Sequence, residues 1–166
     1  TSNRTYRVGP LTLVALALLL KLSVLGADST YPNSTPITIR DGQSASSYPS
    51  TVTVPTIPGV IDKVVVTING FSHATPEDVD ILLVGPDGTA VMLMSDAGGF
   101  PDVANLNLTF DDGGGTMPDN SVISSGTFKP SNYDAADNTE IPEVAGPYST
   151  TLSSFNTKTA AGVWKL

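Results

Sequence analysis

The chain has 166 residues, and its sixteen acidic and eight basic side chains give a formal net charge of −8 at pH 7. This length fits one domain, and a surface this acidic repels nucleic acid and anionic membranes. The sequence contains no cysteine, which excludes both a disulfide framework and a thiolate metal site.

The beginning of the chain differs from the rest in charge and hydropathy. It has no acidic residue before Asp28, so the remainder carries 16 acidic and 5 basic residues, a net charge of −11. Arg4 and Arg7 precede the continuous apolar run Leu11–Leu20, and the small pair Gly26-Ala27 follows it. A basic start, an apolar centre and a small-residue cleavage site are typical of a secretory signal peptide. We therefore expect residues 1–27 to be a signal peptide and the protein to be secreted or at the cell surface, most simply of a bacterium.

Two other interpretations of this segment stay open, an uncleaved membrane anchor and a buried helix. The uninterrupted apolar run has half of the roughly 20 residues that a membrane span needs, which favours the signal peptide. The charged side chain of Lys21 is unusual inside a signal peptide, so a membrane anchor remains an alternative. Residues 28–36 are polar and rich in Pro, Ser and Thr, which predicts a linker to a single domain of residues 37–166.

Beyond the linker the pattern is that of short strands joined by turns. Alternation of apolar and polar residues predicts strands at 50–54, 63–69, 105–110 and, more weakly, 122–128. The stretch from Asp78 to Asp96 predicts a hairpin, with strands Ile81–Val84 and Thr89–Met94 around the turn Gly85-Pro-Asp-Gly88. With 15 Gly, 13 Pro and no convincing helical period after residue 28, the chain is expected to be all-β, an antiparallel jelly-roll β-sandwich.

The end of the chain is an alternating run, Gly162–Leu166, with no closing turn. A domain that stopped there would leave an unpaired strand edge. We therefore expect the sandwich to be truncated at its C-terminus and to lack its last strands.

Residue types argue against a catalytic apparatus. His73 is the only histidine, which excludes a His-based metal cluster. A Ser-His-Asp triad is conceivable on residue types alone, but no G-x-S-x-G nucleophile elbow supports it. The adjacent acids Glu77-Asp78 and Asp111-Asp112 are more typical of solvated turns than of paired catalytic carboxylates. We therefore expect no enzyme activity in the chain itself and a hydrogen-bonded loop or core-edge histidine at position 73.

Calcium binding is a more specific hypothesis for the acidic residues than catalysis. Ca²⁺ takes roughly six to eight oxygen ligands, mostly carboxylates and loop carbonyls. No EF-hand pattern is present, so a site would be assembled from distant loops, and the alternative is a solvated acidic rim. The candidate ligands, all at predicted loop positions or strand ends, are Asp78, Asp80, Asp96, Asp111 and Asp112.

Aromatic residues could form a carbohydrate-binding platform or pack in the core. Most of them lie in alternating strands, which favours core packing. The residues concerned are Phe71, Phe110, Phe128, Phe155 and Trp164.

From about Pro36 to Leu166 the order of motifs resembles the P domain (P/Homo B domain) of subtilisin-like proprotein convertases, in its bacterial form. The motifs are Asp62–Gly70, His73 with Asp78-Val-Asp80, Leu82–Thr89, Ser95–Gly99, Leu108–Asp112, Gly126–Pro130, Leu152–Asn156 and Gly162–Trp164. The resemblance implies a jelly-roll sandwich similar to galactose-binding folds. It also implies a non-catalytic companion of secreted serine endopeptidases in proteolysis, one that stabilises the catalytic domain, tunes its response to calcium and pH, and in some members binds calcium.

The chain departs from that family at both ends. Convertases place the catalytic domain before the P domain, whereas here only residues 28–36 separate the expected signal peptide from the P-like region. The family also continues past the Gly-x-Trp strand. We therefore expect the partners to be other domains of the same longer polypeptide, among them a subtilisin-like protease domain. The alternative is an adhesive or carbohydrate-binding cell-surface module without a protease.

Overall fold

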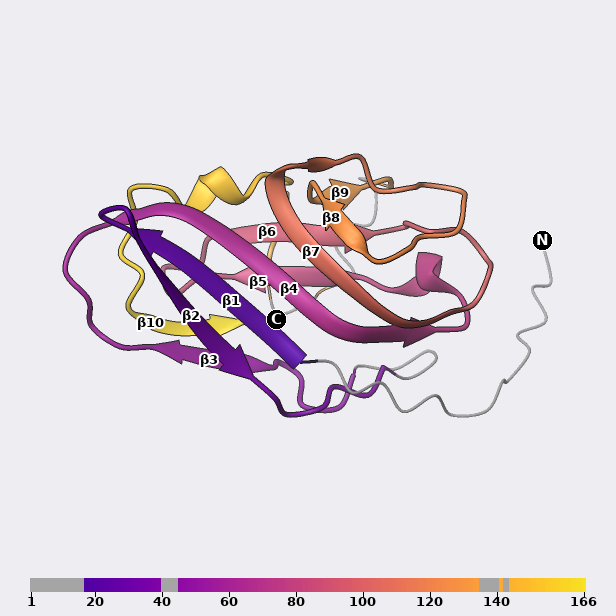
Figure 1. Cartoon of the computed structure of the whole chain (residues 1–166), viewed down its shortest axis with the longest axis horizontal. Coiled ribbons are helices and arrows are strands. Elements are labelled where there is room, and N and C mark those ends of the chain that lie inside the picture. The colour runs from indigo at the N-terminus through magenta and orange to yellow at the C-terminus, as the bar shows by residue number, and fades with distance from the viewer. Residues whose placement is uncertain (1–16, 40–44, 135–140, 142–143) are drawn as a thin grey trace.

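Two five-stranded β-sheets pack face to face in the computed structural model, which describes residues 17–39, 45–134, 141 and 144–166 (Figure 1). Sheet one has the order β2 (Ala27–Asn33), β1 (Ala17–Val24), β4 (Ile61–His73), β7 (Val103–Gly115) and β8 (Gly126–Phe128). Sheet two has the order β3 (Thr51–Val54), β10 (Gly162–Lys165), β5 (Ile81–Val84), β6 (Ala90–Ser95) and β9 (Ser131–Asn132). The described helical elements are short 3₁₀ turns, η1 (Pro76–Asp78) and η3 (Leu152–Phe155). The prediction of an all-β, two-sheet fold is confirmed.

The sheets are mixed and not purely antiparallel as predicted. β8 runs parallel to β7 and β9 runs parallel to β6, both at sheet edges, while the other strand pairs are antiparallel. Parallel neighbours need a crossover connection, and residues 116–125 provide one between β7 and β8. Alternation within a strand cannot distinguish the two directions, because it reports only which face is buried.

The core lies between the sheets and follows the predicted alternation. Val64, Val66 and Ile68 on β4 are at most 2% exposed, and so are Leu108 and Phe110 on β7. Sheet two covers them with residues of β5, β6 and β10 that belong to the same buried cluster. Within the described residues, no helix has the length and apolar character that a bilayer span requires.

The N-terminal segment takes part in the sandwich. Residues 17–24, which include the end of the apolar run in the expected signal peptide, form strand β1 between β2 and β4 (Figure 1). The stretch expected to be a linker, residues 28–36, lies mostly in strand β2. Residues 1–16 lie outside the described part of the chain, so the expected basic start of the signal peptide does too.

Candidate functional site

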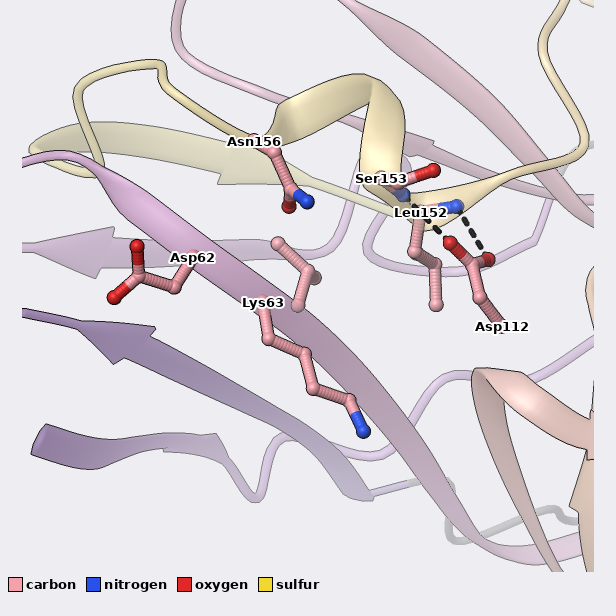
Figure 2. Close-up of a pocket in the computed structure, with 7 residues that line it drawn as sticks. Asp62, Lys63, Asp112, Leu152, Ser153 and Asn156 are labelled. Atoms are coloured by element: carbon pink, nitrogen blue, oxygen red, sulfur yellow. Dashed lines mark hydrogen bonds between the residues drawn. The ribbon is translucent and has the colours of Figure 1, made fainter. Parts of the chain in front are cut away.

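A small pocket lies where β4, the end of β7 and η3 meet (Figure 2). Its volume of about 40 Å³ has room for only a few water molecules. Pockets that bury a drug-sized ligand are roughly ten times larger. The residues that line it are Asp62, Lys63, Val64, Asp112, Leu152, Ser153 and Asn156.

Asp112 joins β7 to η3 on one side of this pocket. Its Oδ1 accepts a hydrogen bond from the backbone N–H of Leu152 at 2.7 Å, and its Oδ2 accepts one from Ser153 at 2.8 Å (Figure 2). The first N–H groups of a helical turn have no partner within the turn. The carboxylate therefore satisfies two backbone donors and holds η3 against the sheet.

Asn156 and Asp62 line the other side of the pocket. The Oδ1 of Asn156 is buried and has no hydrogen-bond partner among the described residues. Asp62 Oδ2 accepts a hydrogen bond from the N–H of Gly26, in the β1–β2 turn, at 3.1 Å. The small volume and the unpaired oxygen of Asn156 suit the pocket to a water molecule that donates to this oxygen.

Asp111, the neighbour of Asp112, contacts a different part of sheet one. Lys63 Nζ lies 2.7 Å from its Oδ2, and the N–H of Gly113 donates to its Oδ1 at 2.9 Å. Burial acts to raise the pKa of Asp111, but the hydrogen bonds from Lys63 and Gly113 outweigh it and lower the pKa below 3.8. Asp111 and Asp112 are therefore engaged by different elements of the fold.

Of the remaining calcium candidates, Asp78 ends η1, and Asp80 and Asp96 lie in loops. Asp78 and Asp80 are exposed on either side of the buried Val79, and Asp96 Oδ2 accepts a hydrogen bond from Ser95 Oγ at 2.8 Å. Among the described residues no three His, Cys, Asp or Glu side chains come together as a metal site would require. As placed, the five aspartates do not fit one coordination shell, and calcium binding stays a prediction.

Lys158 is a residue whose role sequence reasoning missed. Its ammonium lies 2.7 Å from Asp87 Oδ2 and also donates to Thr89 Oγ1, while Asp87 Oδ1 accepts from the N–H of Thr89 at 3.1 Å. Burial acts to raise the pKa of Asp87, but these hydrogen bonds lower it overall. The Asp-Gly-Thr order indicates the local turn, but nothing in the sequence places Lys158, 71 positions away, beside it.

His73 and the aromatic residues have the structural roles predicted for them. His73 is the last residue of β4, and its Nδ1 lies 2.7 Å from the carbonyl oxygen of Thr75, so the ring is held by the backbone that follows the strand. Four of the five candidate aromatic residues are at most 1% exposed and cannot present a ring to a sugar: Phe71, Phe110, Phe155 and Trp164. Phe128 is partly buried and packs against the same core.

No protein-family model matches the chain, and no match to it is found among curated proteins or among solved structures.

Proposed function

We propose that this chain is a non-catalytic accessory module of a secreted or cell-surface multidomain protein. In this proposal it is a jelly-roll β-sandwich of the P-domain type, which accompanies subtilisin-like serine endopeptidases. Its partners are other domains of the same polypeptide, and its role is to stabilise them.

The observation that carries the proposal is the contact between two motifs that only five residues separate in the sequence. Phe155, from the motif Leu152–Asn156, lies against Trp164, from the motif Gly162–Trp164, with ring centroids 4.9 Å apart and an interplanar angle of 57°. Trp164 is fully buried, and its Nε1 donates a hydrogen bond to the carbonyl oxygen of Ala160 at 2.9 Å. Both motifs therefore serve the packing of the sandwich.

The turn motif Leu82–Thr89 joins the same packed unit. A Cβ atom at Gly85 would lie 2.9 Å from the ring of Phe155, and one at Gly162 would lie 2.7 Å from the Cβ of Pro86. Glycine is thus required at both positions by close approach of a neighbour. These residue types in this order are what a stable sandwich needs, which supports a structural module over a catalytic one.

A chimera tests the proposal. The P domain of a secreted subtilisin-like protease is replaced by residues 17–166 of this chain, and the secreted active enzyme and its half-life on heating are measured. We expect both to exceed those of the protease domain alone, because a folded neighbour stabilises the domain it contacts.

The matched control is the same chimera with Trp164→Ala, which removes the central core ring and should lose the gain. Chimeras that secrete no more active protease than the bare catalytic domain would refute the protease association. Retention of the purified chain on polysaccharide or host-surface proteins would then favour the adhesive alternative.

A further inference from the structure

The apolar segment Ala17–Val24 has two incompatible uses. In the fold it is strand β1, paired with β2 on one side and with β4 on the other. It also lies within residues 1–27, whose composition is typical of a removable signal peptide. A chain cut after Ala27 would keep most of β2 but lose β1, which stands between β2 and β4 in the sheet. The cut would open the edge of β4.

We propose that this edge, residues Ile61–Asn69 of β4, is a strand-acceptor site. Its occupant in this structure is residues 17–24. Its occupant after removal of those residues is another extended segment with aliphatic side chains at alternate positions. This strand-acceptor site on β4 does not depend on the accessory function proposed above.

The register defines what the site recognises. Leu20 lies opposite Val66 and Leu22 lies opposite Val64, in an antiparallel pairing that covers residues 17–24. Both leucines are fully buried, so they complete the core between the sheets. Ladder hydrogen bonds provide the affinity in such strand addition, and alternate side chains provide the specificity.

The outward face of β1 contributes little to this specificity. Lys21 and Ser23 alternate with the buried residues and contact Asp28 on β2, with Lys21 Nζ 2.5 Å from Asp28 Oδ2. The side chains of Lys21 and Asp28 are about half exposed, and water and salt screen such pairs. The site therefore selects for the aliphatic alternation and tolerates polar residues at the outward positions 21 and 23.

The test uses the full chain with the double substitution Leu20→Asp and Leu22→Asp, which places charges in the core and expels β1. A fluorescently labelled peptide of residues 17–24, with two lysines added at each end for solubility, is titrated into it. We expect binding and a melting temperature that rises with peptide concentration, because the peptide binds only the folded state. The unaltered chain, whose own β1 fills the site, should bind the peptide at least tenfold more weakly.

Two controls distinguish recognition of the strand from non-specific hydrophobic binding. The first is the same peptide carrying both aspartates. The second is the full chain with Leu19→Asp, which changes an outward position of β1 and should bind no more peptide than the unaltered chain.

A double variant that melts like the unaltered chain would overturn the proposal, as would equal binding of the two peptides. If the double variant does not fold alone, it is refolded from urea with each peptide. Recovery with the unaltered peptide alone supports the site, and equal or no recovery overturns it.

Discussion

Gly162 on β10 and Pro86 in the β5–β6 turn lie so close that a Cβ atom on residue 162 would sit 2.7 Å from the Cβ of Pro86. Gly162 also has a φ of 129°, a backbone conformation that residues other than glycine rarely adopt. The start of β10 is thus fitted to the turn of the neighbouring hairpin by the absence of a side chain.

Replacement of Gly162 by Ala is expected to lower the free energy of unfolding by roughly 2–4 kcal/mol, from backbone strain and overpacking together. Urea denaturation measures the change. Gly88→Ala is the matched control, because Gly88 has φ of 85° with no atom within 4 Å of the added Cβ. It therefore reports strain alone and should cost less. Equal losses at the two glycines would show that contact with Pro86 is unimportant.

Replacement of Trp164 by Ala should cost about 3–5 kcal/mol, as for other large core side chains. It removes the contact with Phe155 and leaves the carbonyl oxygen of Ala160 without its indole donor. Val163→Ala is the neighbouring control, because that side chain is 44% exposed and should change stability by less than about 1 kcal/mol. A Trp164 variant as stable as the Val163 variant would contradict the placement of the ring in the core.

Strand alternation made the fold class predictable, but two segments were predicted differently from the structure. Three consecutive glycines, Gly113–Gly115, have the sequence signal of a turn, yet they end strand β7. Position 114 has no room for a side chain, since a Cβ there would lie 2.6 Å from the backbone carbon of Phe128. A glycine chosen for close approach has the same sequence signal as a turn glycine. In β1, the continuous leucines hide the alternation until Lys21 and Ser23.

The contacts of the candidate site were less predictable than the strands. Asp111 and Asp112 are adjacent in the sequence, but one binds Lys63 and the other caps η3, 40 residues away. Alternation along a strand separates neighbouring side chains, yet it does not say which distant donor meets each of them. Sequence spacing therefore identified the carboxylates and not their partners.

Asp112→Ala is expected to destabilise the fold by about 1–3 kcal/mol, because the partly buried N–H of Leu152 loses its acceptor. Asp112→Asn keeps one acceptor oxygen and should lose less. Hydrogen exchange at Leu152 and Ser153 measures the loss locally, and Asp102→Ala, at an exposed position, serves as the control. Unchanged protection of both amides in the Ala variant would contradict the capping role.

Calcium binding is tested by thermal melting with millimolar calcium and with a chelator. If Asp78 and Asp80 bind the ion, calcium should raise the melting temperature, since it binds the native state alone. The double change Asp78→Asn and Asp80→Asn should abolish that rise, whereas Asp102→Asn should keep it. A melting temperature that does not respond to calcium, with no heat on titration, would remove the calcium hypothesis.

The Lys63–Asp111 pair predicts how stability depends on acid. Burial acts to raise the pKa of Asp111, but the hydrogen bonds from Lys63 and the N–H of Gly113 hold it below 3.8 in the folded state. Above pH 3.8 both states are ionised and the stabilisation is fully present. As the pH falls below that value the unfolded state takes up the proton first, so the stabilisation is lost as the pH approaches the folded-state pKa.

The measurement compares urea unfolding of the unaltered chain with Asp111→Asn, between about pH 5 and pH 2.5. Near pH 5 the unaltered chain should have a larger free energy of unfolding than Asp111→Asn, and the difference between the two should shrink as the pH falls. Lys63→Met is the matched partner variant and should flatten the same dependence, because it removes the main hydrogen bond that lowers the pKa. High salt should weaken the effect only partly, because Asp111 is 18% exposed and its partner 54%. A difference that stays constant across this pH range would show that the pair does not stabilise the ionised carboxylate.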